Sequence, residues 1–535
     1  MAPPEGPSGR GLARATTVLG EYPRQFWILV GGTFIDRLGG ALLFPFFTLY
    51  ITARFGVGMT QVGLLFGVFA LSSAIGTTLG GALTDRLGRK RMFLFGLVAS
   101  ALSSVVMGLV DSLALFVGVV VLVGILADAG FPAQQAMVAD LLPEEKRGEG
   151  FGILRVVVNL AVTIGPMIGG LLAARSYLSL FLADAVTSLV TAAIVFLALK
   201  ESRPAPAEGV PAETMARTFA GYLDVLRNRA FAWFLVTSIL MILVYMQMNT
   251  TLAVYLRDSH GIPAQGFGYL LSLNGAMVVL FQFPIARWAR RFRPLLIMTT
   301  GTLLYAIGFG LYGFVGAYTL FVGAMAIITV GEMLVSPTGQ AIVASMAPGD
   351  MRGRYMATFG YAWLIPSAIG PLVAGLVMDY ADPRWVWYGA GILGLAAAGG
   401  YYLLERRAQR AMHAAIDRRL EIVQALEEGT ISADEAATEI EAVEEDSLVR
   451  LAPSRTAGER RYVRLRTGKG AAGVDLRLPR AIVNTALHTG GRLSAGLDSV
   501  DPAALRLAIA GAAADTGTHI VPSDSGEVEV SVESD

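Results

Sequence analysis

A series of long apolar stretches constrains this chain more than any other feature. About 20 apolar residues in a helix span the ~30 Å hydrocarbon core of a bilayer. Twelve such stretches precede residue 405, near residues 26–50, 60–83, 92–110, 113–137, 150–174, 177–199, 231–256, 266–288, 295–315, 318–342, 355–378 and 385–404. A chain in lipid must satisfy its own backbone hydrogen bonds, so these stretches predict an all-α membrane protein of twelve transmembrane helices.

Composition agrees with a membrane protein and excludes several other classes. Hydrophobic residues make up 54% of the chain and charged residues 16%, against about 25% charged in soluble domains. With no Cys and 4 His, thiolate catalysis, disulfides and common metal sites are excluded. Near Gly468 and Lys469 the glycine and hydroxyl residues of a nucleotide-binding loop are missing. We therefore expect no enzyme, ATP-driven pump, catalytic residue, metal, cofactor or nucleic-acid partner.

Basic residues gather in alternate loops. One side carries the groups around Arg86, Arg147, Arg227, Arg290 and Arg352, whereas the other carries Arg54, Arg175, Arg257 and Arg384. Because basic loops stay in the cytoplasm, both termini are predicted to be cytoplasmic in a multi-pass cell (plasma or inner) membrane protein. The Ala-, Arg- and Gly-rich usage favours a bacterial source.

The two halves of the apolar region repeat each other at an offset of 205 residues. Identical pairs include Pro132/Pro337, Gln135/Gln340, Ala139/Ala344, Pro143/Pro348, Arg147/Arg352, Gly165/Gly370, Pro166/Pro371 and Gly170/Gly375. Six helices per repeat, an even number, give both copies the same topology, related by an axis along the membrane normal. We expect two six-helix bundles around a central cavity.

The repeat sets the predicted organisation of the chain. The expected parts are a cytoplasmic N-terminal segment (1–25), an N-terminal bundle (26–199), a Pro-containing cytoplasmic linker (200–230), a C-terminal bundle (231–404) and a cytoplasmic extension (405–535). Within the extension we predict a helical hairpin (406–446) and a small α+β module (460–535).

The loop after the second predicted helix carries a ten-residue motif of glycines and charged residues. Residues 81–90 read Gly-Ala-Leu-Thr-Asp-Arg-Leu-Gly-Arg-Lys, which resembles the G-x-L-x-D-R-x-G-R-K signature of the major facilitator superfamily; the resemblance covers about residues 20–404. In that family the loop latches the cytoplasmic side closed, which implies a latch formed by Gly81, Asp85, Arg86, Gly88, Arg89 and Lys90. Small Gly81 would let helices approach closely, and Gly88 would permit a tight turn.

The fifth predicted helix carries Gly165, Pro166, Gly169 and Gly170. This run resembles the G-P-x-x-G-G element of the family's drug:proton antiporters. A packing kink found in many transporters is the alternative, favoured by the partial copy in the second half. The fourth helix lacks the basic residue that those antiporters often carry.

Ionisable residues inside predicted helices are candidate functional groups, because burying a charge in a membrane is costly. In the family, helices 1, 4, 7 and 10 line the cavity, which singles out Asp36, Asp128 and Glu332 as proton-coupling or cavity carboxylates. An apolar pocket favours the neutral form of a carboxyl group, which can then exchange a proton as the cavity changes sides. Buried structural ion pairs or hydrogen bonds are the alternative.

Other ionisable and polar residues receive different roles. Arg37 is predicted to pair with Asp128, Asp184 to be structural on a peripheral helix, and Arg155 to reach the cytoplasmic interface. The predicted polar lining of the cavity, which could instead merely pack helices, comprises Arg37, Asn159, Gln247, Asn249, Asn274 and Trp363.

The extension shows its own helix and strand patterns. Ser432 and Glu435 form a capping-box pattern, and 420–443 resembles bacterial SHOCT-like hairpins. Strands are predicted at 462–465, 474–478 and 528–532, with a helix at 503–513. We expect a regulatory or self-associating module with a possible cytoplasmic protein partner; a solvated appendage without a partner is the alternative.

Three functions remain open from the sequence. The first is a secondary active transporter that exports amphipathic small molecules, as in multidrug efflux, by proton antiport across the bilayer. The second is a proton-coupled symporter of a nutrient such as a sugar or peptide. The third is a membrane sensor that uses the transporter fold and signals through its C-terminal tail.

Overall fold

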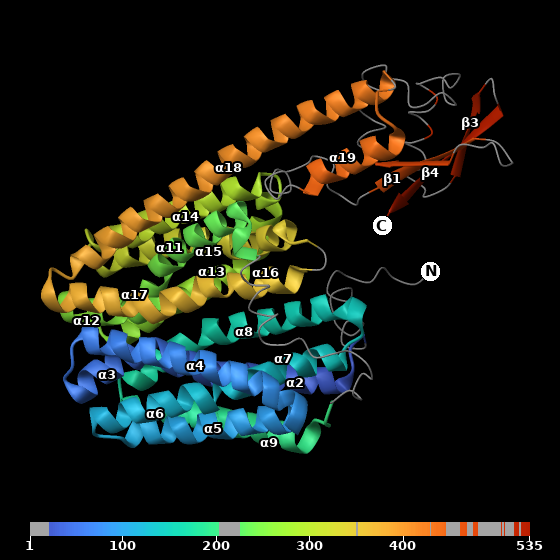
Figure 1. Ribbon diagram of the computed structural model, residues 1–535. Helices are drawn as coiled ribbons and strands as arrows, with labels where there is room; N and C mark the ends of the chain where they lie inside the picture. The colour runs from blue at the N-terminus through green and yellow to red at the C-terminus, as the bar shows by residue number, and fades with distance from the viewer. Residues whose placement is uncertain are drawn as a thin grey trace, which may run out of the picture. The chain divides into compact units, whose positions relative to one another are not determined.

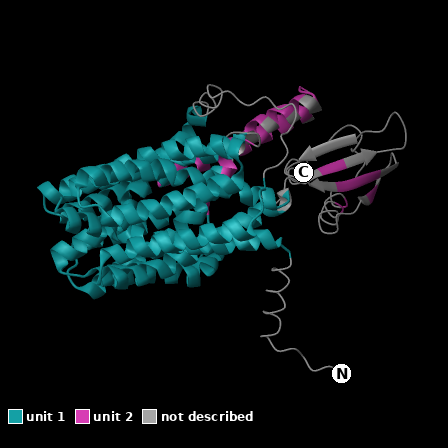
Figure 2. Ribbon diagram, turned by 90° about the horizontal axis from the view of Figure 1, so that it is seen from below, with its two compact units in different colours: residues 1–292, 296–343, 350–401 teal, residues 293–295, 344–349, 402–535 magenta. Residues whose placement is uncertain are grey.

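The computed structural model describes residues 21–202, 225–348, 351–428, 430–445, 461–467, 475–479, 504, 508, 518–523 and 526–534. It separates into two compact units (Figure 2). Unit 1 comprises residues 1–292, 296–343 and 350–401, and unit 2 comprises 293–295, 344–349 and 402–535. Most of the predicted N-terminal segment and of the linker lies outside the described residues.

The N-terminal half of unit 1 is entirely helical. Its elements are α2 (Arg24–Leu43), η1 (Phe44–Phe46), α3 (Phe47–Phe55), α4 (Met59–Leu87), α5 (Arg89–Leu109), α6 (Leu113–Leu126), η2 (Asp128–Gly130), α7 (Phe131–Leu141), α8 (Glu144–Ala173) and α9 (Tyr177–Ala198). Two predicted spans are interrupted by short 3₁₀ turns next to Pro45 and Pro132. Proline cannot donate a backbone hydrogen bond, so an α-helix loosens there.

The C-terminal half repeats this arrangement. Its elements are α11 (Arg229–Thr250), α12 (Leu252–His260), α13 (Ala264–Ala289), α14 (Pro294–Tyr312), α15 (Tyr318–Met346), α16 (Arg352–Phe359), α17 (Tyr361–Tyr380) and α18 (Arg384–Glu427). Among the described residues, 11 helical segments are long and apolar enough to cross a membrane. The predicted twelfth span is the first half of α18; it is helical, but its aromatic residues and glycines make it less apolar.

Figure 1 shows the helices of unit 1 running side by side. Since successive spans alternate in direction, the bundle has two distinct ends. We call the end that carries residues 81–90 the motif end and the other, which carries Gly56 and Gly261, the far end. Both of these glycines have a φ of 62°, a left-handed conformation that glycine adopts without strain.

The two halves pack through two helix pairs, α4 with α17 and α8 with α13. The 205-residue offset converts one pair into the other. A Cβ on Gly63 would collide with the backbone of Leu372, and one on Gly268 would lie 2.5 Å from the Pro166 carbonyl oxygen. Gly63 and Gly268 are equivalent residues of the repeat, so the two halves meet in the same way twice.

A second set of equivalent glycines makes the same contacts from the opposite helices. A Cβ on Gly375 would collide with the carbonyl of Met59, and one on Gly170 would lie 3.2 Å from the carbonyl oxygen of Ala264. Four glycines thus allow backbone-to-backbone contact between the halves. In lipid, where apolar side chains gain little by associating, such close packing is the main source of helix association.

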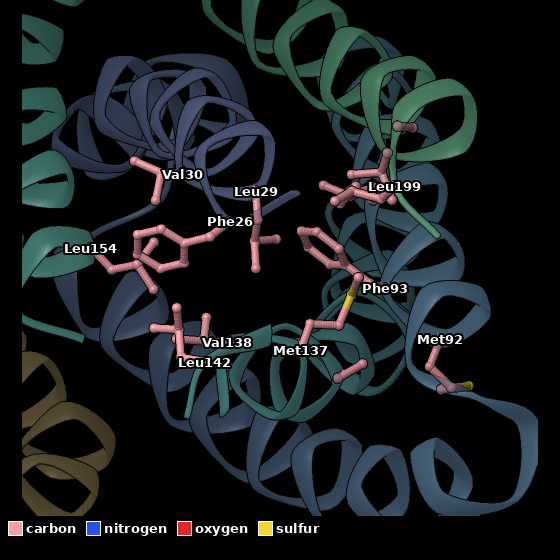
Figure 3. Close-up of a cluster of buried hydrophobic side chains, with 14 of the residues drawn as sticks. Phe26, Leu29, Val30, Met92, Phe93, Met137, Val138, Leu142, Leu154 and Leu199 are labelled. Atoms are coloured by element: carbon pink, nitrogen blue, oxygen red, sulfur yellow. The ribbon is translucent and has the colours of Figure 1, made fainter. Parts of the chain in front are cut away.

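The N-terminal half has a compact apolar core near the motif end (Figure 3). Phe26 and Leu29 of α2 meet Phe93 of α5, Met137 of α7 and Leu154 of α8. Ala192 and Val195 of α9 also belong to this core. Because five α-helices contribute to it, the core holds the half together as a single body.

Unit 2 contains a helical hairpin and a small sheet. The last turns of α18 pack against α19 (Ala433–Glu445) through Ile422, Val423, Ala436 and Ile440. The sheet has the order β2-β1-β4-β3 with all pairs antiparallel, built from β1 (Arg461–Thr467), β2 (Asp475–Pro479), β3 (Thr518–Ser523) and β4 (Gly526–Ser534).

Three of these strands overlap predicted ones, whereas β3 was not predicted. Its sequence is short and contains Pro522, which weakens a strand pattern. Most of the helix predicted at 503–513, and the predicted stop at Gly429, lie outside the described residues.

Replacing Gly63 by alanine tests the glycine interface. We expect the added methyl group to destabilise the bundle by about 1–3 kcal/mol, the usual cost of overpacking, and to lower the thermal unfolding midpoint in detergent. Gly323→Ala is the matched control, because a Cβ at Gly323 meets no atom within 4 Å. Equal midpoints for the two variants would contradict the proposed role of close backbone contact.

The capping box of the hairpin makes a pH-dependent contribution to stability. The Ser432 N–H donates to Glu435 Oε2 at 2.8 Å and the Glu435 N–H donates to Ser432 Oγ at 3.3 Å. The hydrogen bonds from the Ser432 backbone and hydroxyl hold the pKa of Glu435 below its usual value. A lowered pKa means that this stability is present at neutral pH and is lost as pH falls through the folded-state pKa.

We therefore expect hydrogen exchange in α19, normalised to the intrinsic rate, to quicken as pH falls below about 4.5, the ordinary value. Glu435→Gln should exchange faster at neutral pH and lose this pH response. The control Glu439→Gln, which removes a carboxylate paired with Arg418, should keep the response.

Candidate functional site

A cluster of polar side chains surrounds Glu332 of α15 in the C-terminal half. The Tyr245 hydroxyl donates to Glu332 Oε1 at 3.1 Å, and Asn274 Nδ2 donates to Glu332 Oε2 at 2.7 Å. Asn274 also donates to Thr329 Oγ1 at 3.0 Å. Both donors to Glu332 are neutral. The carboxyl group can therefore keep its surroundings with or without a proton.

Aromatic rings enclose this cluster. Trp363 of α17 stands edge-on to Tyr245 at 6.0 Å between ring centroids, and Tyr305 lies 5.6 Å from Tyr245. Glu332 is only partly buried and Trp363 is 47% exposed. Of the predicted cavity residues, Asn274, Trp363 and Glu332 thus come together, on three different helices.

Three other predicted cavity residues lie elsewhere. Gln247 accepts a hydrogen bond from Thr251 at 2.7 Å and donates to the Leu243 carbonyl at 3.0 Å, so it supports the break between α11 and α12. Asn249 is half-buried and Asn159 is exposed; the cluster around Glu332 does not include them.

A second polar group lies between α2 and α9 in the N-terminal half. Ser188 donates to Asp36 Oδ1 at 3.3 Å, and one turn away Ser104 of α5 donates to Asp184. Asp184 is 6% exposed, and a Cβ on Gly39 would lie 2.9 Å from its Oδ1. Sequence reasoning placed Asp184 on a peripheral helix, but the structure buries it beside a predicted cavity carboxylate.

Arg37 attracts Asp128 electrostatically, in line with the predicted pairing, but no direct ion pair or hydrogen bond joins these two described residues. Ser73 donates to Asp128, whereas Arg37 Nη2 donates to Gln134 Oε1 at 3.4 Å and its guanidinium lies over the Phe131 ring at 5.8 Å. A hydroxyl group on α4 is closer to Asp128 than Arg37 is, and spacing along the sequence cannot reveal a partner on another helix.

The motif loop is held to its own half by charge and by a special turn. Gly88 has a φ of 100°, and the N–H groups of Arg89 and Lys90 donate to Glu201 Oε1 at 2.8 and 3.2 Å. Arg89 Nε also pairs with Asp140 at 3.1 Å. An acidic group at a helix N-terminus is stabilised by the helix dipole, so Glu201 fixes the start of α5.

Two details of the motif differ from expectation or lie outside the structure. A Cβ on Gly81 would meet no atom within 4 Å, whereas one on Gly80 would collide with Ala129. The predicted close approach at Gly81 is therefore wrong, and Gly80 provides it. Arg86 is exposed, and the side chain of Asp85 lies outside the described residues.

The motif on α8 serves two interfaces. A Cβ on Gly165 would lie 2.8 Å from the backbone of Ala41, and one on Gly169 would lie 2.5 Å from the Leu42 carbonyl oxygen, both on α2. Gly170 and Pro166 instead face α13. The element therefore packs α8 against its own bundle and against the other half.

Contacts between the halves gather at the far end. Asp379, near the end of α17, accepts hydrogen bonds from the N–H groups of Met59 and Thr60 at 2.8 and 2.7 Å. It caps the N-terminus of α4 from the opposite half. Arg257 donates to Thr52 Oγ1 at 3.0 Å; these two residues are equivalents in the repeat, so they meet on its axis.

Nearer the motif end, one side chain joins the halves. Arg155 of α8 donates to Gln340 Oε1 at 2.6 Å and to Ser336 Oγ at 3.0 Å, both on α15. Sequence reasoning, which expected Arg155 to reach the cytoplasmic interface, did not predict this contact with α15. Ser336 lies one helical turn from Glu332, so this contact joins the N-terminal half to the helix that carries Glu332.

Two repeated bundles of membrane-crossing helices, with polar groups buried between the helices, are the architecture of a transporter. The chain belongs to the Major Facilitator Superfamily, whose family model matches residues 29–279 and 253–445. A Na⁺, Li⁺, K⁺/H⁺ antiporter of Planococcus maritimus is 27% identical over 401 residues, covering 69% of this chain and 92% of that protein.

Other similar proteins fit the same class. The multidrug resistance protein MdtH of Escherichia coli is 23% identical over 395 residues, covering 72% of this chain and 96% of its own length. A crystal structure of a POT family transporter in complex with a thioalcohol-conjugated peptide has a TM-score of 0.60 at 16% identity. The match covers 70% of this chain and 95% of that one. That likeness shows the fold alone.

Asp379→Ala tests the far-end cap. Loss of an N-cap costs about 0.5–2 kcal/mol, so the variant should favour conformations open at the far end. The chain has no cysteine, which makes Ala368→Cys on α17 a unique reporter. Its labelling by a maleimide should quicken several-fold with Asp379→Ala. Asp382→Ala, whose carboxylate pairs with Arg384 in the same loop, should leave the labelling rate unchanged.

Proposed function

We propose that this chain is a proton-coupled exporter of amphipathic small molecules that works by alternating access. One observation carries the proposal: the carboxyl group of Glu332 accepts hydrogen bonds from two neutral donors. It lies at a partly exposed position between membrane-crossing helices. Such a group can take up a proton on one side of the membrane and release it on the other.

Arg155 supplies a physical link between proton and conformation. It contacts α15 one turn from Glu332, so a shift of α15 that accompanies proton binding at Glu332 acts on a contact with the N-terminal half. Proton binding therefore changes the relative stability of two arrangements of the halves.

The contacts between the two halves indicate how the halves move relative to each other. Four glycine contacts, Asp379 and Arg257 hold the halves together around the far end. We propose that the motif end faces the cytoplasm, as the basic loops predict, and that the far end opens when these hydrogen bonds break and the glycine contacts separate.

The similar proteins support antiport over import. One is named as a multidrug resistance protein and another as a Na⁺, Li⁺, K⁺/H⁺ antiporter. The second name favours alkali cations as an alternative cargo. The proteoliposome experiment described next also distinguishes export from nutrient symport and from sensing through the tail.

Proteoliposomes with an imposed pH gradient and a trapped pH dye test the proposal. Ethidium, Na⁺ and a dipeptide are added in separate runs. We expect ethidium to dissipate the gradient, Glu332→Gln to reduce this proton movement at least tenfold because glutamine carries no ionisable proton, and Arg155→Gln to weaken coupling. Glu421→Gln, an exposed Glu of the tail, is the matched control and should match the unaltered protein.

Results other than these indicate one of the alternative functions. Gradient loss with Na⁺ alone indicates alkali-cation antiport, and proton entry together with the dipeptide indicates symport. If deletion of residues 410–535 abolishes partner binding and no added compound moves protons, sensing is correct and export is wrong. Full coupling in Glu332→Gln contradicts the role of that residue.

A further inference from the structure

A cavity lies inside the N-terminal bundle, away from the Glu332 cluster. Its volume is about 190 Å³, and α2, η1, α3, α4, α5, α6 and α9 contribute to its wall. Phe44, Phe47, Phe66 and Phe69 provide an aromatic wall; Phe66 meets Phe44 and Phe47 edge-on, at 5.9 and 6.1 Å. Phe44 is 46% exposed, which places it at the rim.

Asp184 supplies the charged group of this wall. The wall also includes Ser100 and Ser104, and Ser104 donates a hydrogen bond to Asp184. Asp36 lies one turn further along the same helix pair and interacts electrostatically with Asp184. Arg37, the next residue after Asp36, attracts Asp36 electrostatically and donates a hydrogen bond to Gln134. Among the described side chains, the groups that act on the Asp184 carboxylate itself are the Ser104 hydroxyl and Asp36.

We propose that this cavity is a binding subsite for a small amphipathic organic cation, with its apolar body among the phenylalanines and its positive charge at Asp184. The proposal rests on the proposed function, because it makes the cation a cargo of the exporter and gives it a subsite in one half, separate from the proton-binding group.

Size and chemistry both fit such a ligand. A dry apolar cavity of about 150 Å³ is enough to hold benzene, so 190 Å³ accepts one ring with a short chain. Aromatic faces attract cations, most strongly when water is excluded. A carboxylate that is nine-tenths buried gains a full ionic partner from the ligand, which a neutral ligand cannot supply.

Gly40 allows the cavity to be filled without disturbing the packing. It lies in the wall, and a Cβ at this position meets no atom within 4 Å. Gly40→Val therefore puts methyl groups into open space while leaving Asp184 intact. Asp184→Asn does the reverse, because it keeps the shape and removes the charge. Gly118→Val on α6 is the control, since Gly118 also has open space around its Cβ and is not part of the wall.

The experiment measures equilibrium binding to the full-length protein in detergent, without a proton gradient, by calorimetry. The probes are phenethylammonium and its neutral isostere propylbenzene. We expect Asp184→Asn to weaken binding of phenethylammonium about ten- to hundredfold, the usual effect of losing a charge-assisted hydrogen bond, and to leave propylbenzene nearly unchanged. Gly40→Val should weaken both probes, and Gly118→Val neither.

Equal loss of both probes in Asp184→Asn, or unchanged binding in Gly40→Val, would overturn the subsite. Glu332→Gln separates this result from the proposed function. It should keep phenethylammonium binding while it loses proton-coupled transport. If ethidium export remains proton-coupled but phenethylammonium binding is unchanged in both Asp184→Asn and Gly40→Val, the proposed export function is retained and the proposed subsite is wrong.

Discussion

Backbone-to-backbone contact between the two halves is the constraint on which the rest of unit 1 depends. Gly63, Gly268 and Gly375 let α4 meet α17 and α8 meet α13 at distances that no Cβ would permit, and a Cβ on Gly170 would have only a tight 3.2 Å to the Ala264 carbonyl oxygen. Inside a bilayer, lipid tails solvate apolar side chains as well as a neighbouring helix does, so close van der Waals contact must supply the association. The glycines lie at equivalent positions of the repeat, and the same joint is therefore made twice.

The two glycine contacts between the halves, α4 with α17 and α8 with α13, are equivalent, but the polar contacts around them are not. Asp379 caps α4, whereas the equivalent position beside α13 is Ala174. The C-terminal half presents Glu332 with neutral donors, and the N-terminal half presents Asp36 and Asp184 beside serines. A duplicated scaffold has thus acquired a different polar group in each half, which allows proton binding and cargo binding to be separate tasks in the proposed mechanism.

Much of the scaffold could be predicted because its signals are local. Apolar stretches of spanning length follow from the thickness of the bilayer, and the pair Gly170 and Gly375 was visible as an identity at a fixed offset. The capping box at Ser432 and Glu435 likewise depends on four consecutive residues. By contrast, the hydrogen-bond partners of Arg37 and Asp128 were not predicted, the contact of Arg155 with α15 was missed, and the close approach was placed at Gly81 instead of Gly80, because each depends on a partner from another helix.

The sequence by itself determined the membrane class, the repeated halves and the family, since these depend on hydrophobic length, periodicity and a contiguous motif. Only the tertiary structure decided which polar side chains meet. It brought Tyr245 and Asn274 to Glu332, left Gln247 to a local role, and buried Asp184 in a cavity wall. The physical reason is rotation: adjacent residues of a helix point about 100° apart, so small changes in helix orientation decide which of them face a partner, and only packing sets that orientation.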